Sequence, residues 1–299
     1  MSGTKQLVVV HGPEGSLGDW TYFIRILIPE WESLGWSVTV VEDAQRFVPA
    51  DLAIAHIDST QIPEQWLDLL RRYPRVVNGG MTDISKRNIS DPSLLEMDGW
   101  DGPVIVKTDA NCAGRPDRNS RVQSLARRFR PLGWAAKAAF RASDRLFGID
   151  PREPYPVFTS AREVPARLRR NSSLVLQRFV PERDGELYAL RFCTYLGSRG
   201  ITVRSRSAHP IVKARNIVDA SEVEATPEVL EHVRELGGGY GKVDFVLDQG
   251  RPLILDVNPT PTYQGPKPSE RVLRVAHELA PAIEEFLDPD GPETAVGPV

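Results

Sequence analysis

The chain of 299 residues is poor in the residues that build disulfide frameworks and metal sites. Its two cysteines, Cys112 and Cys193, cannot form a disulfide framework, and we therefore expect a reducing, cytoplasmic setting. Its five histidines are scattered, without the short spacings of a zinc site. No apolar run approaches the roughly 18 residues of a membrane-spanning helix, and the first residues do not resemble a signal peptide. These shortages argue against a disulfide-stapled domain, a zinc module and stable membrane insertion.

Charge and aromatic content give no sign of a nucleic-acid-binding protein. The formal net charge is −3, aromatic residues make up 8% of the chain, and basic and aromatic residues do not alternate along it. A chain of this length can form two or three compact units with a good core. We therefore expect a globular protein of several units that does not bind nucleic acid.

The first 80 residues alternate between strand and helix patterns. Apolar runs typical of buried strands occur at residues 6–12, 37–43, 51–58 and 75–80. Between them, apolar residues recur at helical spacing over residues 20–34 and 63–73. This alternation predicts an N-terminal α/β unit with a parallel sheet over residues 1–80.

A glycine-rich segment follows the first predicted strand and raises the question of a dinucleotide site. Gly12, Gly15 and Gly18 are spaced G-x-x-G-x-x-G instead of G-x-G-x-x-G, and Pro13 stiffens the turn. Glu42 ends the second strand, where a dinucleotide site has its acidic residue. A nicotinamide site is therefore one alternative, and a plain strand-to-helix turn facing a substrate is the other.

The most informative segment is GKVDFVLDQGRPLILDVNPTP, residues 241–261, which has the pattern of two strands joined by a tight turn. Because side chains alternate along a strand, Lys242 and Asp244 share a face of the first strand, and Asp256 and Asn258 share a face of the second. A three-residue loop with Gly250 in the left-handed conformation would place Lys242 opposite Asp256. A two-residue loop would send the two acids to opposite faces.

The three-residue loop therefore predicts a polar cluster of two carboxylates, an amide oxygen and an ammonium group on one sheet face. Two neighbouring acids repel each other unless a cation lies between them. All-oxygen ligands suit Mg²⁺, which proteins usually share with substrate phosphates. A hairpin with one solvated face is the plain alternative.

Two further segments carry features that suit phosphate binding. Residues 104–107 form an apolar strand that ends on Lys107, and a loop of small residues follows. A lysine in this place can hold a phosphate as a point charge, while backbone N–H groups of the loop approach it. Residues 113–155 then carry ten basic and four acidic residues, a net charge of +6. This basic insertion is a lid over an anionic ligand, a membrane-surface helix or a solvated insertion.

The order of these features carries a resemblance that none of them carries alone. Along the chain come Lys86, Lys107 with its loop, the strand end QRFV at 177–180, Glu186, Arg191, and finally GKVD and LDVNPTP of the hairpin. In this order the chain resembles the ATP-grasp superfamily over roughly residues 81–286, most specifically in the hairpin.

The resemblance implies a fold that combines α/β with α+β architecture. A parallel-sheet domain of the kind that precedes the ATP-grasp fold would span residues 1–80. The two-subdomain ATP-grasp fold would follow, with a first subdomain over 81–175, including the insertion at about 113–155, and a second over 176–286. The two subdomains of this fold clasp ATP between them. Residues 269–286 have the pattern of a C-terminal helix, and residues 287–299 are expected to form a disordered tail.

The resemblance also implies roles for individual residues. It assigns the phosphates of ATP to Lys86 and Lys107, the adenine to Gln177, Arg178, Phe179 and Val180, and the ribose to Glu186, with Asp184 as the runner-up. It assigns two Mg²⁺ ions, for which Mn²⁺ can substitute, to Asp244, Asp256 and Asn258. Lys242 matches a basic group that faces the γ-phosphate and the reacting carboxylate, and Arg191 is the second catalytic candidate.

The activity implied by the resemblance is that of an ATP-dependent carboxylate–amine ligase. ATP phosphorylates a small-molecule or peptide carboxylate, an amine attacks the acyl phosphate, and ADP and phosphate leave. Candidate substrate contacts are His56, Asp58, Arg206, Lys213 and Arg215. Two alternatives stay open, namely an ATP-grasp kinase acting on a small-molecule hydroxyl and a non-catalytic nucleotide-binding module. The chain is also compatible with a homodimer.

Overall fold

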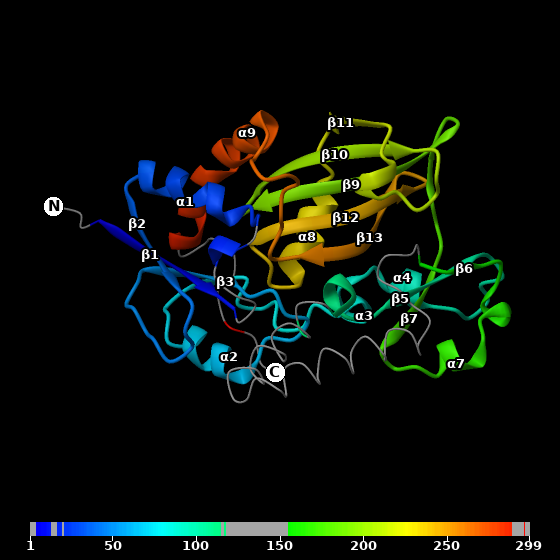
Figure 1. Cartoon of the computed structure of the whole chain (residues 1–299), viewed down its shortest axis with the longest axis horizontal. Helices are drawn as coiled ribbons and strands as arrows, with labels where there is room; N and C mark the ends of the chain where they lie inside the picture. Colours follow the sequence, from blue (N-terminus) through cyan, green and yellow to red (C-terminus); the bar gives the residue numbers. More distant parts are fainter. Residues whose placement is uncertain are drawn as a thin grey trace.

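The computed structural model describes residues 4–12, 17–19, 21–114, 117, 155–288 and 296. Within these ranges the chain forms one parallel and two antiparallel β-sheets with short helices between them (Figure 1). The predicted combination of a parallel sheet with antiparallel sheets is therefore confirmed. Most of the basic insertion at 113–155 and most of the tail at 287–299 lie outside the described residues, so the expectations for both stay predictions.

The parallel sheet is built from the first 80 residues, as predicted, and has the strand order β2-β1-β3-β4. Its strands are β1 (Lys5–His11), β2 (Trp36–Val41), β3 (Leu52–His56) and β4 (Val76–Val77). The helices of this unit are η1 (Leu17–Asp19), α1 (Ile24–Ser33) and α2 (Glu64–Leu70). Residues 7–10 are buried on both faces of β1, which explains why this central strand is an unbroken apolar run.

The larger antiparallel sheet has the order β11-β10-β9-β12-β13, with β8 paired to β9. Its strands are β8 (Glu182–Asp184), β9 (Leu187–Leu196), β10 (Arg199–Ser207), β11 (Asp219–Val223), β12 (Tyr240–Asp248) and β13 (Arg251–Asn258), with η4 (Ala214–Asn216) and α8 (Pro227–Glu235) between them. Val229 and Val233 of α8 share a core cluster with Val243 and Phe245 of β12. Helix α8 therefore covers one face of this sheet, and the alternate residues of β12 point to the other face.

The smaller antiparallel sheet has the order β6-β5-β7 and lies below the larger one in Figure 1. Its strands are β5 (Val104–Thr108), β6 (Val157–Phe158) and β7 (Leu174–Arg178). The short helices around it are α3 (Lys86–Ile89), α4 (Pro92–Leu95), η2 (Asn111–Gly114), η3 (Ala161–Glu163) and α7 (Ala166–Arg169). Helix α3 packs against β13, so it brings the smaller sheet close to the predicted metal hairpin.

The C-terminal part of the described chain packs on the N-terminal unit. The sequence predicts one helix over 269–286, whereas the structure has an α-helix, α9 (Glu270–Leu279), followed by a 3₁₀-helix, η5 (Ala280–Leu287). Pro281 explains the change, because proline lacks an N–H group and clashes with the preceding helical turn. Both helices contribute to a core that also contains residues of β1, α1, β4, β9 and β12. The predicted boundary at residue 80 is thus crossed by a shared core.

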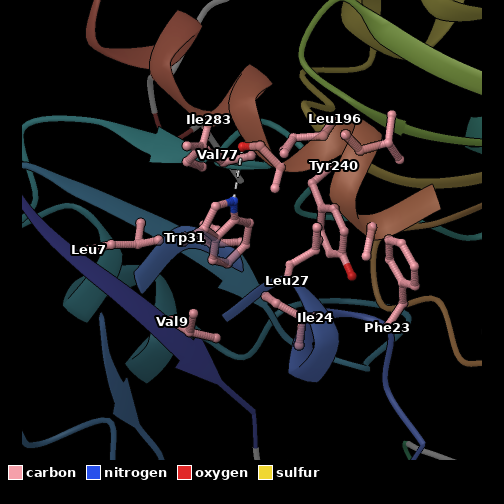
Figure 2. Close-up of a cluster of buried hydrophobic side chains, with 14 of the residues drawn as sticks. Leu7, Val9, Phe23, Ile24, Leu27, Trp31, Val77, Leu196, Tyr240 and Ile283 are labelled. Carbon is pink, nitrogen blue, oxygen red and sulfur yellow. Dashed lines mark hydrogen bonds between the residues drawn. The ribbon is translucent and has the colours of Figure 1, made fainter. Parts of the chain in front are cut away.

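Trp31 lies at the centre of this shared core (Figure 2). Its side chain is fully buried, and its indole Nε1 donates a hydrogen bond of 3.2 Å to the carbonyl oxygen of Ala280. Leu7 of β1 and Ile283 of η5 belong to the same cluster. One side chain therefore links the first strand and the last described helix.

Asn78 joins the end of β4 to the beginning of β12. Its side chain donates to the carbonyl oxygen of Tyr240 at 2.9 Å and accepts from the N–H groups of Gly239 and Tyr240 at 2.8 and 2.9 Å. Its φ of 63° is a conformation that asparagine adopts more readily than most residues. Nearby, a Cβ on Gly80 would lie only 2.8 Å from the Cα of Gly237, so the two backbones are in close contact. The N-terminal unit is therefore docked directly onto the strand that carries Asp244.

Replacing Trp31 with alanine should destabilise the whole molecule. The change removes a fully buried indole from a core shared by both ends of the chain, and truncation of a buried Trp typically costs about 3–5 kcal/mol. Chemical denaturation followed by circular dichroism measures the loss. Leu273→Ala, at a side chain of α9 that is 45% exposed, is the control and should stay within about 0.5 kcal/mol of wild type. Equal losses for the two variants would contradict this account of the core.

Candidate functional site

The β12–β13 hairpin differs from its predicted register. Asp248 pairs with Arg251, so the loop has two residues, Gln249 and Gly250, with φ angles of 51° and 85°. Two positive φ angles are typical of the two-residue turn that suits the twist of a hairpin. The prediction of a three-residue loop is wrong because Gln249 adopts the left-handed conformation as well as Gly250.

A β-bulge nevertheless returns the two acids to the same face. The ladder shifts between Asp244 and Phe245, so that Asp244 pairs with Asp256, Phe245 pairs with Ile254, and Leu255 is the extra residue. Without the bulge, Asp256 would point into the core. Lys242 consequently pairs with Asn258, and not with Asp256 as predicted. The expected cluster of two carboxylates, an amide and an ammonium group is present, in a different register.

The facing carboxylates have lysines beside them. Like charges directly opposite each other on a sheet are destabilising. Lys242 Nζ lies 2.9 Å from Asp244 Oδ1, and Lys86 Nζ lies 3.6 Å from Asp256 Oδ1. Lys86 is only 4% exposed and also donates to the carbonyl oxygen of Ala110 at 3.3 Å. The two ion pairs offset the repulsion between the acids.

A cleft opens between the larger and the smaller antiparallel sheet at this place. Its charged lining comprises Lys86, Lys107, Arg178, Lys213, Asp244 and Asp256. Its apolar lining includes Ile105, Val180, Leu190, Val212, Val246 and Leu255. The empty space of the cleft is about 850 Å³ with its open mouth included. Among the described residues, three lysines thus line the cleft, and a fourth, Lys242, contacts one of its acids.

The pKa of the Lys107 ammonium group is lowered in this cleft. Burial lowers the pKa of Lys107 to about 8, and repulsion from Lys86 adds to the shift. Attraction by Asp256 and Asp244 opposes the shift without cancelling it. The cleft therefore carries more positive charge than its own acids neutralise, and a bound polyanion would relieve this excess.

Only part of the segment 177–180, which the resemblance assigns to the adenine of ATP, lines the cleft. Arg178, Phe179 and Val180 line the cleft, whereas Gln177 is 1% exposed and its side-chain amide donates to Ser90 Oγ at 2.7 Å. The guanidinium group of Arg178 donates to the carbonyl oxygen of Glu96 at 2.6 Å and lies over the ring of Trp100. Of this segment, Arg178, Phe179 and Val180 are therefore the residues available to a ligand in the cleft.

Arg191, predicted to be catalytic, lies on the opposite face of the larger sheet. It pairs with Phe245, one position from Asp244, and therefore points away from the acids. Its Nε and Nη2 donate to Glu182 Oε1 at 3.0 and 2.8 Å, and Glu182 Oε2 accepts the N–H group of Leu247 at 2.8 Å. The structure thus places Arg191 in a nearly buried ion pair with Glu182 and does not bring it to the cleft.

Four other predicted contacts are also absent from the lining of the cleft. Glu186 is exposed in the turn between β8 and β9, and Asp184 lies 3.1 Å from Arg204. Arg206 is paired with Asp219 and Asp184, and Arg215 is exposed in η4. Of the predicted substrate contacts, Lys213 alone lines the cleft, where its ammonium group lies 4.8 Å from the ring centroid of Tyr155.

His56 and Asp58 lie at the carboxyl end of β3, away from the cleft lining. His56 is fully buried, and burial together with the neighbouring His11 lowers its pKa. Asp58 accepts hydrogen bonds from the Tyr22 hydroxyl at 3.2 Å and from Asn111 Nδ2 at 2.9 Å. Burial raises the pKa of Asp58 to about 6, although these donors oppose the shift. Asp58 therefore joins the N-terminal unit to the loop that follows Lys107.

Glu42, considered above for a dinucleotide site, is engaged in a local contact. Its Oε1 accepts the backbone N–H group of Leu17 at 2.6 Å. The carboxylate thus holds the chain within the glycine-rich segment, of which residues 13–16 lie outside the described ranges. This contact supports the plain strand-to-helix turn.

The cluster has the donor set of a Mg²⁺ site that is completed by a ligand. Among the described residues, no group of three or more His, Cys, Asp or Glu has the arrangement of a metal site. Asp244 and Asp256 supply two carboxylates and Asn258 an amide oxygen, and Mg²⁺ typically combines one or two carboxylates with phosphate oxygens and water. These residues therefore fit Mg²⁺ bound together with a phosphate. In the same described part of the chain, no helix is long and apolar enough to cross a membrane.

Removing Arg191 should affect stability more than any chemistry in the cleft. Arg191→Met leaves Glu182 as an unpaired, nearly buried carboxylate, and breaking a buried pair in this way typically costs about 3–5 kcal/mol. The double variant Arg191→Met/Glu182→Gln should recover part of this loss, because no uncompensated charge remains. Urea denaturation of both variants measures the difference. A double variant that is less stable than Arg191→Met would contradict the assignment.

Comparison with known proteins finds similar solved structures. No protein-family model and no curated protein matches it. It is similar to D-alanine–D-alanine ligase from Bacillus anthracis, with 12% identity, a TM-score of 0.45, and coverage of 95% of this chain and 97% of that chain. It is similar to a RimK domain ATP-grasp protein from Sphaerobacter thermophilus, with 14% identity, a TM-score of 0.45, and coverage of 94% and 99%. The third is the ATP-grasp ligase PsnB complexed with minimal precursor, Mg and ADP, with 13% identity, a TM-score of 0.47, and coverage of 94% and 97%.

The names of these solved structures agree with the ATP-grasp resemblance recognised in the sequence.

Proposed function

We propose that this chain is an ATP-dependent ligase that joins a carboxylate to an amine through an acyl phosphate. The observation that carries the proposal is the facing pair Asp244 and Asp256, which lies among lysines in a cleft between two antiparallel sheets. A pair of carboxylates in a cationic cleft suits a triphosphate bound with Mg²⁺, because the acids can hold the metal while the lysines contact the phosphates. The proposed site holds two Mg²⁺ ions.

The apolar part of the cleft suits the base of the nucleotide. Val246 and Leu255 belong to one cluster with Val180 and Leu190, and all four side chains line the cleft. The β-bulge at Leu255 therefore serves two purposes, because it turns Asp256 toward the cleft and adds an apolar side chain beside it. A planar base between these walls would direct the triphosphate toward the lysines.

The lysines supply the charge that phosphoryl transfer needs. Lys86, Lys107 and Lys213 would contact the phosphates and stabilise the charge that develops on the transferred group. Asp244, Asp256 and Asn258 would hold the Mg²⁺ ions, which when bound neutralise phosphate oxygens. Lys242, the ammonium group nearest Asp244, would stabilise the attacking carboxylate.

The reaction proceeds in two displacements in this proposal. A carboxylate oxygen of the substrate attacks the γ-phosphorus, the bond to the bridging oxygen breaks, and ADP leaves. The amine nitrogen then attacks the acyl carbon, the bond to the phosphate oxygen breaks, and the amine proton passes to solvent. Forming the acyl phosphate gives the second step a good leaving group.

A hydroxamate assay tests the activity. With ATP, Mg²⁺ and a library of carboxylic acids, hydroxylamine should replace the natural amine and yield a hydroxamate together with ADP. Asp256→Ala should lower the rate by about 10²–10³, the usual cost of removing a group that stabilises the transition state. Asp248→Ala, at an exposed acid of the same hairpin outside the cleft, is the matched control and should keep the wild-type rate.

The products of this assay also distinguish the alternatives. A stable phosphorylated product without hydroxamate would indicate a kinase, and AMP with pyrophosphate would indicate adenylation. Full activity of folded Asp256→Ala would contradict the proposed role of the acid pair.

The lowered pKa of Lys107 predicts a pH signature of nucleotide binding. At pH 8.5 a lysine with a pKa of about 8 is mostly neutral, and a bound triphosphate would return it to the charged form. Binding of ATP with Mg²⁺ should therefore take up roughly 0.7 proton at pH 8.5 and almost none at pH 6.5 through this group. Calorimetry in two buffers of different ionisation enthalpy measures the uptake, and Lys107→Met should abolish it.

The same pKa shift sets the pH dependence of the unliganded protein. Because the folded pKa of about 8 lies below the usual 10.5, the free energy of unfolding is reduced below pH 8. This reduction should disappear as the pH rises from 8 toward 10.5.

In the calorimetric experiment, a proton uptake on ATP binding that is equal in wild type and Lys107→Met would contradict the assignment to Lys107.

A further inference from the structure

Thr260 makes two hydrogen bonds to the side-chain oxygen of Asn258. Its backbone N–H group donates to Asn258 Oδ1 at 2.8 Å, and its hydroxyl donates to the same atom at 3.1 Å. Thr260 is 1% exposed, so water does not compete for the hydroxyl. An amide oxygen has two lone pairs, and here both have a donor. Asn258 can act as a metal ligand only if one of the two donors is withdrawn.

The two donors differ in how easily they can move. The N–H group of Thr260 is held by the backbone turn that follows β13. The hydroxyl hydrogen, in contrast, turns about the Cβ–Oγ1 bond and can choose between acceptors. The hydroxyl is therefore the donor that a second acceptor could draw away from Asn258.

Asp58 is that second acceptor. Thr260 also lies close enough to Asp58 to lower the pKa of that carboxyl, beside the hydrogen bonds that Asp58 accepts from Tyr22 and Asn111. These three side chains come from three segments, namely the residues just before α1, η2 after β5 and the turn after β13. With a pKa raised by burial to about 6, the Asp58 carboxyl is ionised at pH 7.5 and accepts hydrogen bonds with both oxygens.

We propose that Asp58 is a positioning residue that accepts the Thr260 hydroxyl and thereby leaves Asn258 Oδ1 a lone pair for the metal. This inference rests on the proposed function, because it concerns the metal that accompanies the nucleotide. It assigns Asp58 a role through Thr260 and no contact with substrate. The N-terminal unit thus controls a ligand of the metal hairpin, although Asp58 and Asn258 are 200 positions apart in the chain.

The inference makes an unusual prediction for paired substitutions. In Asp58→Asn the neutral amide is a poorer acceptor, so the Thr260 hydroxyl should return to Asn258 and weaken metal binding by about tenfold, the lower end of the effect seen when groups that support metal ligands are replaced. Thr260→Val keeps the shape and removes the hydroxyl, so it should bind the metal at least as well as wild type. The double variant Asp58→Asn/Thr260→Val should regain wild-type affinity, because no hydroxyl remains to compete.

Mn²⁺ is a suitable probe, since its free concentration is measured directly by electron paramagnetic resonance. Each variant is titrated with Mn²⁺ in the presence of saturating ADP at pH 7.5, and thermal melting confirms that it is folded. If Asp58 has only a structural role, the double variant should bind Mn²⁺ no better than Asp58→Asn, which would overturn the inference. A tenfold loss in Thr260→Val alone would also overturn it, and this variant leaves Asp58 intact should the Asp58 variants fail to fold.

The same titration separates this inference from the proposed function. A wild-type protein that binds no Mn²⁺ with ADP would refute the proposed function itself. A wild-type protein that binds Mn²⁺, together with an equal affinity in folded Asp58→Asn, would leave the proposed function standing and refute the role of Asp58.

Discussion

Two carboxylates that face each other across a hairpin form the interaction on which the site depends. Asp244 and Asp256 are direct cross-strand neighbours, an arrangement that is unfavourable without compensating charge. Lys242 compensates from the same strand, and Lys86 does so from helix α3, which belongs to the smaller sheet's side of the cleft. The acid pair therefore ties the two walls of the cleft together electrostatically, and the same acids are available to hold a cation that arrives with a polyanion.

The larger sheet separates two kinds of charge by the alternation of its strands. On the cleft face, Asp244 has open space beside it and cations in excess. On the opposite face, Arg191 and Glu182 satisfy each other and a backbone N–H group, in a nearly closed arrangement. A satisfied buried pair contributes to the specificity of the fold, whereas an incompletely neutralised cluster in a cleft can bind a ligand. This contrast is the physical reason for seeking function on one face only.

The sequence was informative wherever a local pattern determines structure. The four strands of the parallel sheet follow from their apolar runs, and Lys107 lies at a strand end in the cleft, as expected from its position after an apolar run. The sequence does not indicate the sheet face of Arg191, because its partner Glu182 is identified only by the pairing of β8 with β9. The bulge at Leu255 has no signature in the sequence, since an extra apolar residue fits equally well in a regular strand.

Local sequence patterns also do not predict contacts between segments that are distant in the chain. Thr260 follows the hairpin in the motif that carried the resemblance, yet nothing in its surroundings indicates Asp58 as a partner. The pattern of residues 269–286 predicts a helix without indicating which sheet the helix covers. Such contacts depend on how whole units dock, and docking is specified by shape that is spread over many side chains.

The docking of α9 and η5 onto the first strands has a consequence for how the chain is made. During synthesis the N-terminal sheet emerges from the ribosome first, but Leu7 and Trp31 obtain part of their core only when Ile283 has been added. Until then an apolar face of the early sheet stays open to solvent, and its closure requires contacts between residues far apart in sequence, which form slowly. The nascent chain should therefore be a good substrate for chaperones that bind exposed apolar surface, and release from them should coincide with the arrival of the last helices.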